Sequence, residues 1–225
     1  MAKRDLDGAI VVVLGGTGGL GAPISAELES RGATVVRVNR SGEGADLRLD
    51  LRDGTAGAEL ARAISDRYGR LDGVVNAAGI VAFGDLADTD DVVVEELFLT
   101  NAMGPMWVAR AVLPLLTESG GFFANISAVV ASTPMPSMAA YSASKAAAAA
   151  GFQALRKELR RSKVHVIDIQ PPHTETGLAT RPIAGTAPTM PDGLQPSTVA
   201  ARVVTAIEND EALVAADQFA DRSAD

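Results

Sequence analysis

Tyr141 and Lys145 are the two residues whose types and spacing most directly suggest catalysis. Residues four apart on a helix lie on one face, so the phenol and the ammonium would be neighbours. A free phenol titrates near pH ~10, which is too high for a general base at neutral pH, but a nearby ammonium favours the phenolate. The pair is therefore suited to proton exchange with a substrate oxygen. The alternative is a helix that carries a tyrosine and a lysine by coincidence.

A glycine-rich turn suggests a phosphate-bearing ligand. The segment LGGTGGLG places Gly15, Gly19 and Gly21 directly after an apolar run and before a helical pattern. Glycines at such a turn let backbone amides approach a pyrophosphate and let the helix pack closely on the strand. An ordinary glycine-rich loop is the alternative, but the position between strand and helix favours dinucleotide binding.

The end of the next apolar run bears on which dinucleotide binds. An acidic residue here usually accepts hydrogen bonds from the ribose of NAD. This chain has the neutral Asn39, followed by Arg40 and Ser41. A guanidinium can pair with the 2′-phosphate of NADP, so the sequence favours NADP(H), with NAD(H) as the second choice. The alternative is a solvated surface arginine.

Short apolar runs and longer helical patterns alternate along the chain, and these elements must position the residues above. Strands are predicted at 9–14, 34–39, 71–79, 121–127 and 164–169, with a short one in ALVAA at 212–216. Helices are predicted at 20–30, 55–68, 89–116, 141–161 and 197–209. This alternation is typical of a parallel sheet buried on both faces. We predict one α/β domain over 1–225, of the Rossmann-type doubly wound class, with a mainly parallel sheet and helices on both faces. A lid over the substrate is predicted at 171–196, where Pro, Gly and Thr are frequent.

Composition narrows the possible partners and the compartment. The chain has 225 residues, a formal charge of −8 and a pI near 4.8, which argues against nucleic acid or an anionic membrane as a partner. It has no cysteine and only two histidines, so no metal site is predicted. No apolar run has the length of a membrane span, and the first residues have no signal-peptide core. We expect a cytoplasmic protein.

Taken together, the motifs resemble those of the short-chain dehydrogenase/reductase family, from the first strand to about Thr176. YSASK (141–145) resembles the family's Tyr-x-x-x-Lys, NAAG (76–79) its strand end, and QPPHTET (170–176) the turn beside the nicotinamide. NAMG (101–104) matches the segment whose asparagine holds a relay water, which implies a catalytic set of Tyr141, Lys145 and Asn101. The resemblance and the turns above imply cofactor contacts from Gly15, Thr17, Gly19, Leu20, Gly21, Asn39, Arg40, Ser41, Asp50, Leu51, Asn76, Ala77, Ala78, Gly79, Tyr141, Lys145, Pro171 and Thr176.

One position departs from the family in a way that affects catalysis. The family places a serine thirteen residues before the tyrosine, where it hydrogen-bonds the substrate oxygen, and this chain has Ala128 there. Ser127 or Ser132 could replace it, although adjacent strand residues point to opposite faces. The substrate could instead need less stabilisation, or a water could fill the space. In a third interpretation the chain binds cofactor with little or no catalysis, as a sensor or scaffold.

The resemblance implies an NADP(H)-dependent oxidoreductase that interconverts a carbonyl and a secondary alcohol, with Tyr141 as the acid or base. The sensor or scaffold is the alternative. A small-molecule substrate is expected, in a pocket lined by apolar residues: Phe83, Met103, Met106, Met135 and Met138. The two histidines, His165 and His173, are expected to be structural and solvated, respectively. The resemblance also implies a homodimer through the helices at 89–116 and 141–161, whereas the short acidic C-terminus makes a tetramer doubtful.

Overall fold

The computed structural model describes residues 3–219 and shows seven strands in one sheet. The sheet order is β3-β2-β1-β4-β5-β6-β7, and every neighbouring pair is parallel. The strands are β1 (Ile10–Leu14), β2 (Thr34–Asn39), β3 (Leu47–Arg48), β4 (Gly73–Asn76), β5 (Phe122–Ile126), β6 (His165–Ile169) and β7 (Leu213–Val214). The predicted doubly wound α/β class is confirmed.

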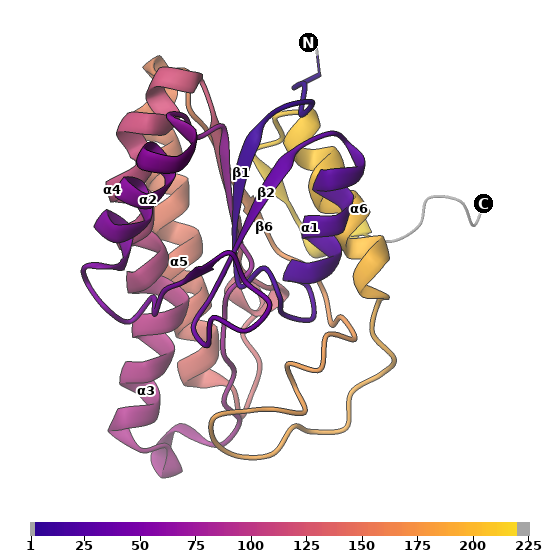
Figure 1. Ribbon diagram of the computed structural model, residues 1–225. Coiled ribbons are helices and arrows are strands. Elements are labelled where there is room, and N and C mark those ends of the chain that lie inside the picture. The colour runs from indigo at the N-terminus through magenta and orange to yellow at the C-terminus, as the bar shows by residue number, and fades with distance from the viewer. Residues whose placement is uncertain (1–2, 220–225) are drawn as a thin grey trace, which may run out of the picture.

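Helices cover both faces of the sheet (Figure 1). The α-helices are α1 (Gly21–Ser30), α2 (Ala56–Tyr68), α3 (Asp91–Phe98), α4 (Gly104–Ser119), α5 (Ala139–Glu158) and α6 (Pro196–Glu208). The shorter helical segments are η1 (Leu86–Asp88), η2 (Leu99–Met103), η3 (Val129–Ala131), η4 (Leu159–Arg161) and η5 (Ala216–Phe219). Helices α1 and α6 lie on one side, and α2, α4 and α5 lie on the other.

Alternating side chains of each strand enter two separate cores, because successive strand residues point to opposite faces. In β1, Val11 and Val13 pack with Ile24 and other residues of α1 and α6. Val12 of the same strand packs with Phe152 of α5 and with residues of α2 and α4. Burial on both faces explains why the strands read as continuous apolar runs.

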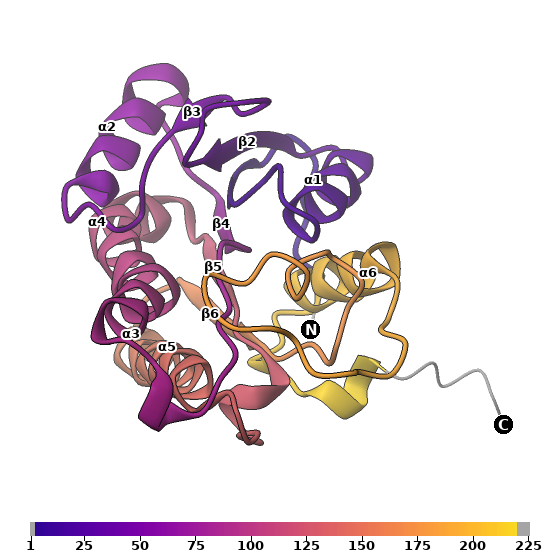
Figure 2. The same ribbon diagram turned by 90° about the horizontal axis from the view of Figure 1, so that it is seen from below.

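The strand order reverses between β1 and β4, and this reversal determines where a ligand fits. Helices following neighbouring strands leave on opposite faces at such a point, which opens a crevice at the carboxyl ends of the strands. The glycine-rich turn follows β1, and residues 77–79 follow β4. The lid passes along this edge of the sheet (Figure 2).

Three features differ from the sequence-based expectation. The two-residue β3 was not predicted, since two residues give no measurable alternation. The strand predicted at 71–79 is shorter, because β4 ends at Asn76 and the following residues turn along the crevice. The single helix predicted at 89–116 is divided into α3 and α4 by the π-helix η2. The domain predicted over 1–225 includes residues 1–2 and 220–225, which lie outside the described residues.

Candidate active site at the carboxyl edge of the sheet

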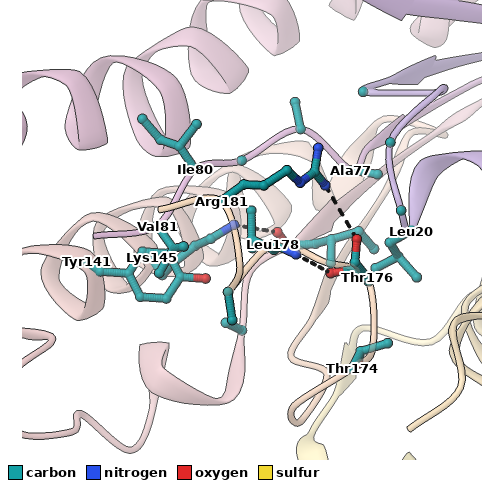
Figure 3. A pocket seen from close by; sticks show the side chains of 18 of the residues that line it. Leu20, Ala77, Ile80, Val81, Tyr141, Lys145, Thr174, Thr176, Leu178 and Arg181 are labelled. Atoms are coloured by element: carbon teal, nitrogen blue, oxygen red, sulfur yellow. Dashed lines mark hydrogen bonds between the residues drawn. The ribbon is translucent and has the colours of Figure 1, made fainter. Parts of the chain in front are cut away.

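A cavity of about 930 Å³ lies along this edge, between the glycine-rich turn, the start of α5 and the lid. Figure 3 shows Tyr141 and Lys145 on one side, Leu178 of the lid in between, and Thr176 of the lid beside Leu20 and Ala77 on the other side. The cavity is large enough for a dinucleotide together with a small substrate. All predicted cofactor residues line it except Gly21, Ser41 and Asn76.

The glycine-rich turn is packed against backbone on two sides. Gly15 has a φ of +72°, and a Cβ there would lie 2.9 Å from the Cα of Ala78. A Cβ on Gly19 would lie 2.0 Å from the carbonyl oxygen of Thr176 in the lid. Helix α1 then starts with no acidic residue in its first turn, so its free N–H groups and dipole favour an anion. These features fit the pyrophosphate of a dinucleotide.

The three residues that do not line the cavity have other surroundings. Gly21 is buried behind the turn, and a Cβ there would lie 2.0 Å from the carbonyl oxygen of Gly15. The Ser41 hydroxyl donates to Asn39 Oδ1 at 3.4 Å. Asn76 is buried, and its Nδ2 donates to Asn125 Oδ1 at 2.9 Å. The structure therefore places these three behind or beside the cofactor groove.

At the end of the groove near β2, one arginine is available and another is fully paired. The Arg52 guanidinium donates to both carboxylate oxygens of Asp50 and, at 2.9 Å, to Glu96. The hydrogen bonds from Arg52 hold the pKa of Asp50 below its usual value. The Arg40 side chain is 62% exposed and lies 4.0 Å from Glu96. Arg40 is thus the cation that can accept a new anionic partner here.

Asn39 has an architectural role that the sequence did not suggest. Its Nδ2 donates to Thr17 Oγ1 and to the carbonyl oxygen of Glu43, both at 2.7 Å. Its Oδ1 accepts from the Gly42 amide at 2.5 Å. Asn39 therefore ties the turn after β2 to the glycine-rich turn and holds the groove's rim in place.

The predicted catalytic pair lies on the first turns of α5, as the four-residue spacing requires. Tyr141 and Lys145 are both buried and both line the cavity. Lys145 Nζ donates to the carbonyl oxygen of Ile126 at 3.2 Å. Burial raises the pKa of Tyr141. The phenol is therefore protonated at neutral pH, which suits a proton donor.

Asn101 lies on the π-helix η2, which directs its side chain toward the start of α5. A Cβ on Gly79 would lie 3.1 Å from Lys145 Nζ and 3.3 Å from Asn101 Oδ1, so the three residues are in close proximity. Asn101 Oδ1 accepts from the Ile80 amide at 2.9 Å, and its Nδ2 donates to Ser144 Oγ at 3.0 Å. Asn101 is behind the cavity wall rather than on it. A relay water at this residue remains a prediction.

Ala128 lines the cavity at the position where the family has its serine. Ser127 is buried, and its Oγ donates to the carbonyl oxygen of Ile169 at 3.2 Å. Ser132 is exposed, does not line the cavity, and donates to the carbonyl oxygen of Val129. Neither hydroxyl takes the place of the missing one, so in this structure the position beside Tyr141 has no donor from these two residues.

The lid is attached to the segment after β4 by backbone hydrogen bonds. The Ile183 amide donates to the carbonyl oxygen of Val81, and the Phe83 amide donates to that of Ala184. Apolar lid residues pack around Tyr141 together with Phe83 and Met138: Leu178, Ala179, Ile183, Ala184 and Ala187. The lid therefore closes an apolar chamber over the phenol.

Two cationic or ionisable lid residues also line the cavity. Arg181 donates to the carbonyl oxygens of Gly177 at 3.0 Å and Thr176 at 3.4 Å, and within 3–219 it has no acidic partner. His173 Nε2 lies 3.3 Å from Glu175 Oε1, so the imidazole contacts another lid residue and not solvent alone. The Pro-rich composition predicted a lid here, but no local pattern indicated that Arg181 would face the cavity (Figure 3).

The expectations for the methionines and for His165 have mixed outcomes. Met135 and Met138 line the cavity with Phe83. Met103 and Met106 are exposed and do not line it, so that part of the prediction is wrong. The π-helix and the start of α4 direct these two side chains outward. His165 Nε2 lies 3.0 Å from the carbonyl oxygen of Glu211, consistent with a structural role.

Among residues 3–219, no group of three or more His, Cys, Asp and Glu side chains is arranged to hold a metal ion. None of the helices in this range is both long and apolar enough to cross a membrane.

Comparison with known proteins identifies the family. A family model described as short chain dehydrogenase matches residues 9–184, which include the glycine-rich turn, the Tyr–Lys pair and part of the lid. The chain belongs to this family. The matched residues include the parallel strands from β1 to β6 and the cavity that they border.

Individual relatives agree with this assignment. A bovine protein named dehydrogenase/reductase SDR family member 7B is 30% identical over 193 residues, covering 76% of this chain and 59% of the relative. An uncharacterized oxidoreductase of Staphylococcus epidermidis is 31% identical over 180 residues, covering 74% of this chain and 78% of the relative. A short chain dehydrogenase of Burkholderia cenocepacia, crystallised in complex with NADP, has a TM-score of 0.83 at 26% identity, covering 96% of this chain and 91% of that one. This chain spans about three fifths of the length of the vertebrate relatives.

Proposed function

We propose that this protein is an NADP(H)-dependent oxidoreductase that interconverts a carbonyl and a secondary alcohol. The observation that carries the proposal is the arrangement of one cavity. Tyr141 and Lys145 line one part of it, and the glycine-rich turn with Gly15 and Gly19 lines another. A proton donor and a dinucleotide groove in one cavity are what hydride transfer to a carbonyl requires.

The groove has the features that would hold NADP(H). The turn and the start of α1 would bind the pyrophosphate, and Arg40 would pair with the 2′-phosphate because its side chain is 62% exposed and only weakly paired. Arg181 adds a cation at the lid side of the groove. The similar protein from Burkholderia cenocepacia was crystallised with NADP. A neutral Asn39 in place of a carboxylate also favours NADP(H) over NAD(H).

A dinucleotide held in this groove would supply the hydride, and the protein's own residues would transfer the proton. Burial raises the pKa of Tyr141, so its phenol can donate a proton to the substrate oxygen as that oxygen gains charge. Lys145 holds a positive charge close to Gly79 and Asn101 and would bind the ribose hydroxyls. The apolar lid residues around Tyr141 exclude water from the reacting atoms.

Ala128 supports a second candidate, a cofactor-binding sensor or scaffold with little turnover. A serine would give one direct hydrogen bond to the substrate oxygen, and loss of such a donor typically costs ~2.7–4 kcal/mol. That cost slows a reaction without abolishing it. Burying Lys145 costs free energy because its charge is removed from water. A scaffold would gain nothing from a buried Tyr141 and Lys145 that offsets this cost. We therefore favour the enzyme.

The test is a panel of aldehydes, ketones and secondary alcohols, assayed by nicotinamide absorbance with both cofactors. Turnover with NADPH, faster than with NADH, is expected for at least one carbonyl with an apolar body. Isothermal titration of NADPH is measured in parallel. Binding of NADPH without turnover across the whole panel would favour the sensor, and absence of binding would exclude both proposals.

We also propose that the protein is a cytoplasmic homodimer. The outer surface of η2, α4 and α5 exposes Met103 and Met106, and Met106 lies against Gly151, where a Cβ would be 3.2 Å from its sulfur. Exposed apolar side chains beside small residues suit close helix packing between copies. Light scattering should give twice the monomer mass, and Met106→Glu should shift it toward the monomer. A monomeric wild type at micromolar concentration would contradict this proposal.

A further inference from the structure

A row of buried polar side chains crosses the carboxyl ends of three neighbouring strands. Asn76 of β4 donates to Asn125 of β5 at 2.9 Å, and Asn125 donates to Asp168 of β6 at 3.1 Å. Gln170 donates to the other carboxylate oxygen of Asp168 at 2.9 Å. The three strand residues are direct register partners, Asn76 with Asn125 and Asn125 with Asp168. The row is therefore fixed by the sheet itself.

Asp168 is the only ionisable member of this row, and it is 2% exposed. Both of its oxygens accept from neutral amides, and within 3–219 no cation lies within 4.0 Å of it. A buried carboxylate without an ion pair is unfavourable unless other groups stabilise its charge. Neither proton transfer by Tyr141 nor cofactor binding, as proposed above, uses Asp168. A different role must therefore explain why a carboxylate is buried at this position.

Asp168 lies on the face of the sheet that α5 covers. Val166, two residues earlier in β6, packs in the core beneath α5 with Phe152. Alternation along the strand places Asp168 on this same face, beneath the helix that carries Tyr141 and Lys145. Lys145 Nζ reaches the carbonyl oxygen of Ile126, the residue that follows Asn125 in β5. The carboxylate and the ammonium are thus both buried beneath α5, on the same face of the sheet.

Two opposing effects act on Lys145 there. Burial lowers its pKa and the negative charge of Asp168 raises it, and the net result is a pKa of about 8. Opposite charges interact over longer distances in a protein interior than in water, so contact is not required. Without the carboxylate, burial alone would lower the pKa of Lys145 further.

We propose that Asp168 is a positioning residue that keeps Lys145 charged inside the site. This inference rests on the proposed function, because a charged Lys145 matters for supporting Tyr141 and the ribose. The titratable groups around Lys145 are Tyr141 on its own helix and Asp168 on β6. The π-helix η2 and the loop after β4 contribute the uncharged Asn101 and Gly79, and the lid adds Arg181 and His173 to the same cavity.

The test is a direct titration of Lys145 in the full chain by NMR, with ¹³C-labelled lysine and Lys145→Met to assign the ε-carbon resonance. In wild type the midpoint should lie near pH 8. In Asp168→Asn it should fall by about 1 unit or more, the usual size of an opposite-charge effect. The asparagine can still accept from Asn125, and rotation of the Gln170 amide restores the other hydrogen bond, so the fold should persist. An unchanged midpoint overturns the proposal.

Controls distinguish an effect of the Asp168 charge from a general disturbance of the structure by the substitution. Asp72→Asn removes a carboxylate at the opposite, amino edge of the sheet, where Asp72 pairs with Arg70, and should leave the Lys145 midpoint unchanged. The exposed Lys3, Lys157 and Lys163 serve as internal references. If Asp168→Asn does not fold, the wild-type ¹³Cγ resonance of Asp168 at pH 7 decides, and a protonated acid there overturns the proposal.

The titration requires neither cofactor nor substrate, so it is independent of whether the protein reduces any carbonyl. Where turnover is measured, the pH above which reduction declines should move down in Asp168→Asn by the same amount as the Lys145 midpoint. A merely structural role for Asp168 would lower the melting temperature and leave this pH limit in place, which would count against the proposal.

Discussion

The two walls of the cavity are built in different ways. The cofactor wall consists of the glycine-rich turn and residues 77–79, where backbone lies directly against backbone, as at Gly15 and Ala78. The substrate wall consists of residues 128–130, residues 135–138 and the lid, where apolar side chains pack around Tyr141. A few backbone hydrogen bonds, such as that from Ile183 to Val81, hold the lid to the rest of the wall.

The difference shows which properties each wall can change. On the cofactor wall an added atom collides with main chain, so the turn tolerates little substitution. On the substrate wall a side chain can be exchanged for another of similar volume at a cost usually below ~1.5 kcal/mol. Ala128 lies on this second wall, which is where a family member can lose a donor and keep its fold. Tyr141 and Lys145 lie between the two walls.

Removal of the phenol hydroxyl should have the largest effect. Tyr141→Phe keeps the ring in its apolar chamber but removes the proton donor, so turnover should fall by ~10²–10⁴-fold. NADPH binding, which depends on the other wall, should change little. Absorbance assays and calorimetry measure the two quantities. Tyr68→Phe, on α2, is the matched control and should leave both unchanged; equal activity of Tyr141→Phe and wild type would refute the catalytic role.

Restoration of the missing donor tests the substrate wall. Ala128→Ser should raise turnover by about tenfold or more, because a hydroxyl there can hydrogen-bond the oxygen that gains charge. The cofactor's Kd should not change. Ser127→Ala is the companion variant. If Ala128→Ser has no effect and Ser127→Ala abolishes turnover, Ser127 has taken the role and the substrate wall rearranges when substrate binds.

A methyl group on the cofactor wall should disturb both walls where they meet. In Gly19→Ala the new Cβ would lie 2.0 Å from the Thr176 carbonyl oxygen, so the lid must shift. Overpacking of this kind costs ~1–3 kcal/mol, and we expect a lower melting temperature together with weaker NADPH binding. Gly54→Ala is the control, since a Cβ there meets nothing within 4 Å. Normal NADPH affinity in Gly19→Ala would show that the lid and the turn are not coupled.

The same contrast explains what the sequence could predict. The strands and the glycine-rich turn follow from apolar runs and glycine positions, which are local signals. The place of Tyr141 and Lys145 follows from helical spacing. The π-helix that brings Asn101 toward Ser144 has no local signal of its own, because it results from packing against α5.

Long-range pairs were out of reach for the same reason. The Arg52 pairing with Glu96 joins residues 44 apart in sequence, and the Asn125–Asp168 hydrogen bond joins residues 43 apart. Both depend on which strands and helices become neighbours. The outward direction of Met106 likewise depends on which face of α4 meets the sheet. Sequence patterns identify such residues but do not show which other residues they contact.

The smallest predicted effect concerns the rim of the cofactor wall and the choice between NADPH and NADH. Arg40→Ala removes the guanidinium that would pair with the 2′-phosphate, and because that side chain is 62% exposed the loss should be only ~1 kcal/mol, about fivefold in Kd. The affinity for NADH should stay the same, so the ratio of NADPH affinity to NADH affinity should decrease. Arg62→Ala, exposed on α2 and away from the cavity, should change neither affinity.

Added salt should weaken NADPH binding in wild type more than in Arg40→Ala, since screening acts on an exposed charge pair. If the preference for NADPH and its salt dependence both survive Arg40→Ala, the 2′-phosphate is held elsewhere, and Arg52 would have to leave Asp50 to reach it.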